Sequence, residues 1–333
     1  MKIKKNFLRV LCILFCSVIS VQIRAHVLVF VHLGTTLPSY LEDAVWQASL
    51  FNDPNEIYVI ANQKALEQPH KFGGVHIIPA ETLQATERHV AFRKNSTLDK
   101  DFREAFWFYA SERFLYLDDF MQQYDVKDLF HLESDNLLFV NLKDLLPIFQ
   151  QKYPHIGAIF NNDWCCLPSF IYLAHKQAMA HLADLFAQTA GTGYLDMQVI
   201  GLYRHRYRSL IEHLPIVPPS YKDFYPLINS YGERPNNGED YSKHSELFQS
   251  LFDGNAFGQY LGGIDPRNGF SIPGHVNESC VFNSSHLQYE FDIDSVGRLV
   301  PYALFKGERY RINNLHMHSK NLKLKQFLSI KIV

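Results

Sequence analysis

The N-terminal part of the chain alternates short apolar runs with one amphipathic stretch. Residues 27–31, 56–62 and 75–78 are rich in β-branched and aromatic side chains and are bounded by polar or turn residues, which predicts three strands. Residues 40–50 carry apolar side chains at helical spacing, which predicts a helix between the first two strands. This order of strand, helix and strand is typical of a parallel α/β sheet.

The rest of the chain continues the pattern with longer elements. Residues 102–124 lack Gly and Pro and carry an aromatic stripe, which predicts one packed helix or two consecutive helices. Residues 215–250 show no clear period, so we expect irregular structure there, and residues 251–270 are rich in Gly. We find no internal repeat, which favours one catalytic domain. The remaining expected elements are strands at 130–132, 156–160 and 169–173, helices at 141–153, 175–188 and from 194, and a hairpin formed by 286–291 and 299–304.

The composition is that of a globular chain whose net charge does not favour binding to nucleic acid. The 333 residues are 47% hydrophobic, which is enough to bury a full core in one large domain or two modest ones. Lys and Arg number 32 against 34 Asp and Glu, and a formal net charge of -2 argues against nucleic acid as a partner. Aromatic residues make up 14% of the chain, which is first explained by a Phe-rich core and also suits carbohydrate or nucleoside sites.

Residues 1–25 have the features of a targeting segment. A short basic region precedes an apolar run at 10–21 and Ala25, as in a secretory signal peptide, although Ile23 is a poor residue for cleavage. The run is short for a transmembrane helix, and the alternative is a signal-anchor that associates with a membrane through residues 7–23. We therefore expect an exported or membrane-anchored protein, whose catalytic domain faces the cytoplasm or the Golgi lumen if the leader is retained.

An acidic pair ends the apolar run at 128–132. Glu133 and Asp135 are two positions apart, so at the exit of a strand both side chains project to the same side and can reach one cation. The alternative is a strand that leaves the core through a polar turn. Ligands of parallel sheets bind at the carboxyl ends of the strands, which also makes His32 and Asn62 candidate site residues.

Two histidines near the C-terminus repeat the spacing of the acidic pair. One imidazole from His316 or His318, together with two carboxylates, is a partial shell for a divalent ion, and we expect Mn²⁺ ahead of Mg²⁺. A lone histidine is more often a structural hydrogen-bonding residue. Here, however, the pair is flanked by side chains that are able to meet phosphate oxygens, namely Asn313, Asn314, Ser319 and Lys320.

Several well-known motifs are missing from the sequence. There is no Walker loop, no G-x-G-x-x-G after the first expected strand and no G-x-S-x-G elbow. A Gly-rich phosphate nest at the first strand is therefore not expected, and a metal that bridges carboxylates to a diphosphate is the remaining simple solution. This favours a nucleoside diphosphate donor.

Together these features resemble glycosyltransferases of the GT-A fold with a DxD-type motif. Residues 130–136 and 169–172 carry the resemblance to the fold, and residues 252–266 and 315–322 are similar to motifs of a little-characterised microbial branch of such enzymes. The combination is more specific than the acidic pair alone.

The resemblance implies a GT-A-like, Rossmann-type mixed sheet flanked by helices, with a C-terminal hairpin and tail that close the site. It implies a glycosyltransferase domain at 26–325, between the leader at 1–25 and a tail at 326–333. The activity implied is transfer of a sugar, of hexosyl type, from a nucleoside diphosphate-sugar to a hydroxyl of a glycan, lipid or protein.

The resemblance also implies roles for the candidate metal ligands. Asp135 would hold the metal that bridges the donor diphosphate, and Glu133 would approach the ribose or reach the metal through water. His316 or His318 would be the C-terminal ligand. Glu133 stands in place of the first Asp of a strict D-x-D, which leaves metal binding intact and the ribose role open.

Donor contacts are implied for residues that lie outside the acidic pair. His32 and Asn62 occupy the strand ends where GT-A enzymes receive the nucleoside, and Lys320 is placed for the diphosphate. Gln259 and Gly262 would also contact the donor, with a plain tight loop as the alternative for both.

Asp196 sits where inverting members of the family carry the base that activates the acceptor. Asp163 and Asp265 are rivals for this role. The structural alternative for Asp196 is a carboxylate at a helix N-terminus, where it interacts favourably with the helix dipole.

Two other functions compete with the glycosyltransferase. An exported metallohydrolase would use the same Glu, Asp and His residues to activate water and would act on phosphoesters without any sugar nucleotide. A non-catalytic carbohydrate-binding protein would bind glycans through its aromatic residues, with no metal-dependent turnover.

Overall fold

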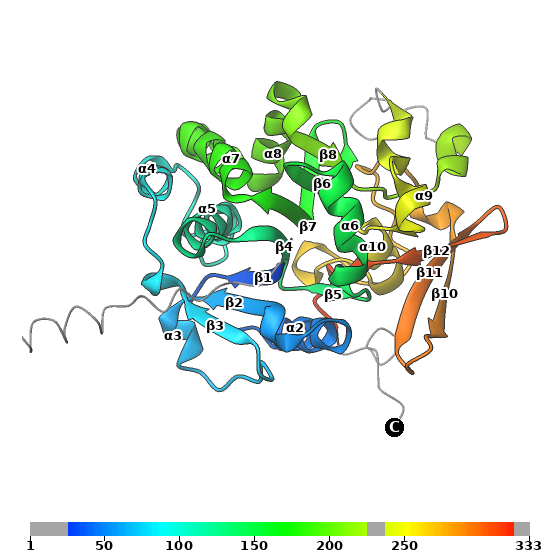
Figure 1. Ribbon diagram of the computed structural model, residues 1–333, viewed down its shortest axis with the longest axis horizontal. Coiled ribbons are helices and arrows are strands. Elements are labelled where there is room, and N and C mark those ends of the chain that lie inside the picture. Colours follow the sequence, from blue (N-terminus) through cyan, green and yellow to red (C-terminus); the bar gives the residue numbers. More distant parts are fainter. Residues whose placement is uncertain (1–25, 225–236, 323–333) are drawn as a thin grey trace, which may run out of the picture.

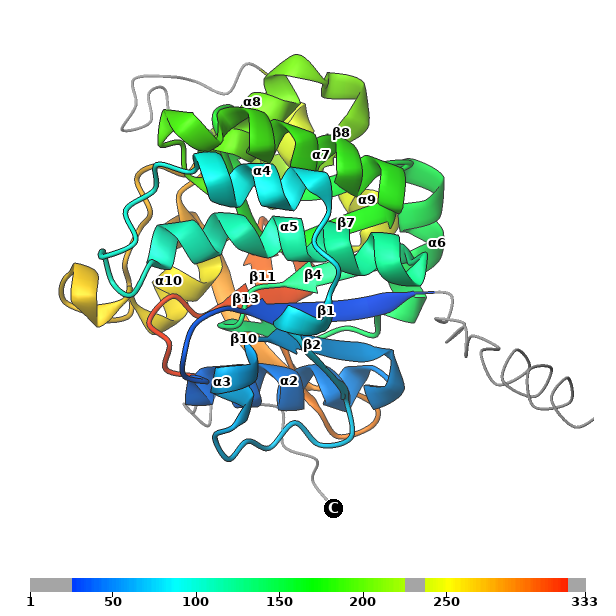
Figure 2. The same ribbon diagram turned by 90° about the vertical axis from the view of Figure 1, so that its left-hand side faces the viewer.

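The computed structural model describes residues 26–224 and 237–322. Its centre is a mixed seven-stranded sheet with helices on both faces (Figure 1 and Figure 2). The mixed α/β sheet expected from the sequence is thereby confirmed. The expected leader at 1–25 and tail at 326–333 lie outside the described residues.

The seven strands lie in the order β3-β2-β1-β4-β7-β6-β8. The first four strands in the sequence pair in parallel, β7 is antiparallel to both β4 and β6, and β8 is parallel to β6. Because β1 and β2 are buried on both faces, their sequences are continuous apolar runs rather than alternating ones. The strand bounds are β1 (Val27–His32), β2 (Ile57–Ala61), β3 (His76–Pro79), β4 (Lys127–Leu132), β6 (Ile156–Asn162), β7 (Cys165–His175) and β8 (Ile211–His213).

Helices cover the two faces of this sheet. The neighbouring helices α4, α5 and α7 lie on one face, and α2 and α6 lie on the other (Figure 1). Among the described residues, no helix is both long and apolar enough to cross a membrane. The helix bounds are α2 (Ser39–Phe51), α3 (Gln63–Leu66), α4 (Glu87–Asn95), α5 (Phe106–Tyr124), α6 (Leu142–Lys152), α7 (Lys176–Thr189), α8 (Asp196–Arg206), α9 (Ser245–Phe248) and α10 (Ala256–Gly262).

Two smaller sheets connect the C-terminal part of the chain to this core. The expected hairpin is present as β10 and β11, in a four-stranded sheet of order β10-β11-β12-β9. In the second small sheet β13 pairs antiparallel with β5, which follows β4, and His316 lies opposite Asn136. The end of the described chain therefore returns to the carboxyl end of β4. The bounds are β5 (Asn136–Leu138), β9 (Ser250–Leu251), β10 (Gln288–Ile293), β11 (Leu299–Phe305), β12 (Glu308–Ile312) and β13 (Asn314–His316).

The structure differs from the sequence-based expectation at several elements. The helix expected from residue 102 begins at Phe106, because residues 103–105 all have left-handed φ angles. The Gly-rich segment, for which no helix was expected, contains α10, and the Asp253 carboxylate accepts from the N–H groups of Phe257 and Gly258 in its first turn. α4 was not expected, because it is polar along its length and packs largely through charged side chains.

A buried ionic layer joins α4 to α5. His89 on α4 is fully buried, and its two ring nitrogens lie 2.5 Å from Asp119 Oδ2 and 3.3 Å from Glu112 Oε1. Burial alone would lower the pKa of His89, but the hydrogen bonds to Asp119 and Glu112 outweigh burial and raise it. Arg93 also donates to Glu112, at 2.5 Å. Removal of one charged side chain from this layer would therefore leave another buried charge uncompensated.

We expect the contribution of His89 to stability to decrease as pH rises. The pKa of His89 is higher in the folded protein than in the unfolded chain, where it is about 6.5. The contribution of His89 to the free energy of unfolding is therefore complete below about pH 6.5 and is lost as pH rises through the folded-state pKa. His89→Gln should lower the free energy of unfolding by about 3 kcal/mol near pH 6 and by less at higher pH. Urea unfolding at both pH values measures the difference, with His181→Gln as control, because His181 bonds to the neutral Tyr203 hydroxyl. An effect of the same size at both pH values would contradict a charged His89.

Candidate functional site

The acidic pair lies in a tight turn between β4 and β5. The N–H of Glu133 donates to Ser169 O on β7, and the N–H of Asn136 donates back to Glu133 O, which closes the turn. The N–H of Met317, just after β13, donates to Asp135 O. These backbone contacts fix both acidic residues and bring the C-terminal segment against them.

Glu133, Asp135 and His316 form a cluster at this point. Each offers one possible ligand atom, and these atoms all lie within 4.8 Å of one another. His316 Nε2 is 3.3 Å from Glu133 Oε2 and 3.2 Å from Asp135 Oδ1. Lys320 also donates to Asp135. Two carboxylate oxygens and an imidazole nitrogen are a donor set that suits Mn²⁺ or Mg²⁺, so the residues present fit the expected ion.

The charges of the cluster depend on one another. Burial would lower the pKa of His316, but Asp135 and Glu133 outweigh burial and raise it to about 9. Burial would raise the pKa of Asp135, yet Lys320 and His316 hold it well below its usual value. Burial would likewise raise the pKa of Glu133, but Arg113 and His316 lower it. Both carboxylates are therefore ionised at neutral pH, as metal ligands must be, whereas His316 would release a proton on binding an ion.

Arg113 connects the cluster to Asp196. Its guanidinium donates to Glu133 Oε1 at 2.5 Å and to Asp196 Oδ2 at 2.8 Å. Asp196 is the first residue of α8 and is buried; burial raises its pKa, although Arg113 opposes the increase. Arg113 was missed by the sequence analysis. The signal available was a charged residue within the aromatic stripe of α5.

Asp253 and Gly254 hold His316 in place. His316 Nδ1 lies 2.5 Å from Gly254 O, so Nδ1 carries the proton and donates it, which leaves Nε2 directed at the two carboxylates. The backbone N–H of His316 donates to Asp253 Oδ2 at 3.0 Å. Gly258 on α10 lies so close to β13 that an added Cβ would be 1.9 Å from His316 O. These residues support the site and were also missed from the sequence.

His32 and Asn62 lie at the ends of β1 and β2, as expected, but both are engaged in local contacts. His32 Nε2 is 3.0 Å from Thr36 O. Asn62 accepts from the Gly34 N–H at 2.8 Å and donates to Glu81 at 2.9 Å. The two residues thus shape the loop after β1.

The two histidines of the C-terminal pair are placed differently. His316 belongs to the cluster, whereas His318 Nδ1 accepts from the Asp265 N–H at 3.0 Å. Burial together with the neighbouring His316 and Lys320 lowers the pKa of His318 to about 4. Of the two histidines, only His316 is brought within ligand distance of both carboxylates.

The rival carboxylates have partners of their own. Asp163 is buried and accepts from the Tyr241 hydroxyl at 2.5 Å. Asp265 forms an ion pair with Arg267 at 2.6 Å, and this hydrogen bonding lowers the pKa of Asp265 to about 2. Asp196 differs from both because its partner, Arg113, is shared with the cluster.

The remaining candidates lie around the C-terminal segment. Gln259 is buried, and its Oε1 has no hydrogen-bond partner among the described residues. An added Cβ at Gly262 would lie 2.5 Å from the Met317 methyl group. Asn313 and Asn314, noted above as able to meet phosphate oxygens, are fully buried and donate to groups within the protein.

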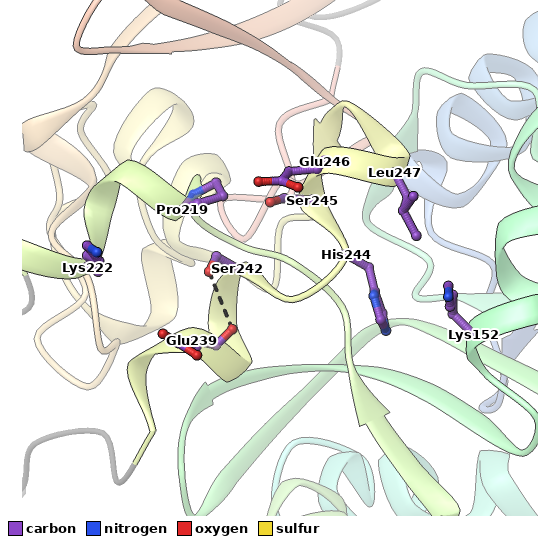
Figure 3. A pocket seen from close by; sticks show the side chains of 9 residues that line it. All are labelled: Lys152, Pro219, Lys222, Glu239, Ser242, His244, Ser245, Glu246 and Leu247. Atoms are coloured by element: carbon purple, nitrogen blue, oxygen red, sulfur yellow. Dashed lines mark hydrogen bonds between the residues drawn. The ribbon is translucent and has the colours of Figure 1, made fainter.

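A separate hollow of about 490 Å³ lies on the surface (Figure 3). None of the three cluster residues lines it. Its wall comes from the end of α6, from α9 and from the segments before α9. We therefore place the candidate site at the cluster and not in this hollow. The lining residues are Lys152, Pro219, Lys222, Glu239, Ser242, His244, Ser245, Glu246 and Leu247.

Comparisons with known proteins find similarity only among solved structures. No protein-family model matches the chain, and no curated protein matches it. Mouse xyloside xylosyltransferase 1 in its apo form is 12% identical over 67% of this chain and 92% of that chain, with a TM-score of 0.42. The galactosyltransferase LgtC with donor and acceptor sugar analogues is 12% identical over 59% of this chain and 77% of that chain, with a TM-score of 0.36.

Nucleotidyltransferases are also among the similar structures. A cytidylyltransferase from Leptospira borgpetersenii is 10% identical over 57% of this chain and 75% of that chain, with a TM-score of 0.36. At identities and TM-scores this low, these similarities assign neither a family nor an activity to the chain.

We expect the geometry of the site to depend on the absence of a side chain at Gly258. Gly258→Ala would place a Cβ against the backbone of His316, which cannot yield without moving β13. The change should lower the free energy of unfolding by about 3 kcal/mol and weaken Mn²⁺ binding. Gly262→Ala is the control, because its Cβ meets the flexible end of Met317, and about 1 kcal/mol is expected. Urea unfolding and calorimetric Mn²⁺ titration compare the two; equal losses would contradict a special role for Gly258.

Proposed function

We propose that this protein is a metal-dependent glycosyltransferase that moves a sugar of hexosyl type from a nucleoside diphosphate-sugar to a hydroxyl acceptor. The observation that carries the proposal is the cluster of Glu133, Asp135 and His316, which joins the end of a central strand to the C-terminal segment. Ligands of open α/β sheets bind at this edge, outside the carboxyl ends of the strands.

Asp135 and His316 would hold the ion, with Glu133 beside it. We propose that residues 133–135 act as a DxD-type motif of a microbial GT-A branch, with Glu133 as the first acid. When bound, Mn²⁺ in preference to Mg²⁺ would neutralise charge that builds on the leaving diphosphate. Glu133 is already held by Arg113, so its orientation is fixed before any ligand arrives.

The donor would lie over the ends of β1 and β2. Lys320 supplies an ammonium group beside Asp135 and suits the diphosphate. Gln259, whose buried Oε1 has no partner within the described part of the chain, and Gly262 are proposed to border the donor near the C-terminal segment. His32 and Asn62 would meet the nucleoside.

Asp196 would take the proton of the acceptor hydroxyl. The hydroxyl oxygen then bonds to the anomeric carbon as the bond to the diphosphate oxygen breaks, and the proton remains on Asp196. Burial raises the pKa of this carboxyl above its ordinary value, which makes it a stronger base than an exposed aspartate. Arg113 orients it at 2.8 Å. Asp163 is a weaker candidate, because its carboxylate accepts from a buried tyrosine.

Sugar nucleotides are available in the cytosol and the Golgi lumen. We therefore propose that residues 7–23 associate with a membrane and that the catalytic domain faces one of these compartments. The acceptor would be a hydroxyl of a glycan, a lipid or a protein.

Removal of the Asp135 charge is the decisive test of this function. Asp135→Asn should lower Mn²⁺-dependent transfer and donor hydrolysis on the order of 100-fold, because the ion loses an anionic ligand. Thermal shifts with a panel of nucleoside diphosphates, with and without Mn²⁺, first identify the donor base. Asp144→Asn on the exposed surface of α6 is the control. Full activity of Asp135→Asn would refute the proposal, and phosphoester cleavage without any sugar nucleotide would favour the metallohydrolase.

The two candidate bases can be separated kinetically. Asp196→Asn should reduce kcat on the order of 100-fold while the donor Kd stays within about threefold, because a base acts on the acceptor and not on donor binding. Asp163→Asn should instead reduce stability, through its buried contact with Tyr241. Steady-state kinetics and donor titration distinguish the variants. The reverse pattern would assign the base to Asp163.

A further inference from the structure

Both carboxylate oxygens of Asp135 already have partners. Asp135 Oδ1 lies 3.2 Å from His316 Nε2, and Oδ2 accepts from the Lys320 ammonium. An ion that binds Asp135 must therefore compete with one of these groups. Which of the two can leave is determined by how each is held.

His316 is held firmly. Its ring donates to Gly254 O, its backbone N–H donates to Asp253, and it lies buried in β13 against α10. Movement of the ring away from Asp135 would break these contacts and leave buried polar groups unpaired. His316 is thus the fixed partner of Asp135.

The Lys320 side chain is held in place by fewer contacts than the His316 ring. Its side chain is 22% exposed and ends a flexible four-carbon stem. Its backbone has a left-handed φ of 61°, which disfavours a residue with a Cβ by roughly 1 kcal/mol. Besides Asp135, the only other group recorded beside its ammonium among the described residues is the Tyr40 ring, whose centre lies 5.3 Å away, a weaker contact made in the same position. Lys320 is thus the movable partner.

Movement of the Lys320 ammonium away from Asp135 would make the charge around the cluster more negative. The carboxylates of Glu133, Asp135 and Asp196 face two permanent cations, Arg113 and Lys320. Most of the negative charge that would attract a divalent ion is therefore neutralised already. A diphosphate would draw the ammonium away from Asp135 and restore that attraction.

We propose that Lys320 is an exchangeable cation, which occupies Asp135 before the ion binds and moves to the diphosphate of the donor when both ligands are present. This inference rests on the proposed function. Since coupling between two ligands is reciprocal, the ion and the nucleoside diphosphate should each strengthen the binding of the other, and Lys320 should account for part of that effect.

The test is a calorimetric titration of Mn²⁺ into the full chain and into Lys320→Met. Without nucleotide, the variant should bind Mn²⁺ roughly fivefold more tightly than the wild type, because a competing ion pair is gone. With uridine or guanosine diphosphate present, the strengthening of Mn²⁺ binding should be smaller in the variant than in the wild type. Lys176→Met is the matched control, since Lys176 pairs with Asp125 at 2.7 Å outside the cluster. Circular dichroism melting verifies that each variant is folded.

Mn²⁺ affinity that is unchanged or weaker in Lys320→Met would overturn the exchange. Equal tightening in Lys176→Met would also overturn it, because the effect would then reflect net charge alone. If Lys320→Met binds Mn²⁺ more tightly but no nucleoside diphosphate of the thermal-shift panel binds the wild type, the competition at Asp135 stands and the proposed transferase function fails. The two failures are therefore distinguishable.

Discussion

The antiparallel pairing of β13 with β5 is the contact on which the candidate site depends. It is short, with His316 opposite Asn136, yet it joins segments that lie far apart in the sequence. Closing so long a loop loses chain entropy, which a three-residue ladder alone would not offset. The additional stabilisation comes from the buried amides around it: Asn314 bonds to Asn136 and to Asp253 O. The buried amide of Asn314 thus helps to hold the site together.

The charged residues of the site share their ion-pair partners. Glu133 and Asp196 share one guanidinium, and Asp135 shares its two oxygens between an imidazole and an ammonium. A buried charge without a partner would cost several kcal/mol, so the acids are kept ionised by their neighbours in the absence of an ion. The cluster is therefore organised before a ligand binds, which limits the reorganisation that binding requires.

The sequence predicted the parts of this structure that follow from local pattern. Strands buried on both faces read as continuous apolar runs, and the acidic pair could be recognised because it interrupts one of them. His316 was found through its spacing from His318, although the choice between the two depends on tertiary contacts. Arg113 and Asp253 could not be predicted, because each acts on a partner that is distant in the sequence. α10 was missed for a different reason: it is short and contains two glycines, which disfavour a helix, whereas the Asp253 carboxylate stabilises its first turn from only four and five residues away.

The pairing of β13 with β5 also determines when the site can exist during synthesis. Every strand of the seven-stranded sheet precedes residue 214, whereas β13 begins at Asn314. A ribosome releases the chain from its N-terminal end, so the sheet can begin to assemble about a hundred residues before His316 emerges. During that interval the acidic turn has neither its histidine nor Lys320. The nascent protein thus carries an incomplete cluster, and the candidate site is completed only after every strand of the central sheet has been synthesised.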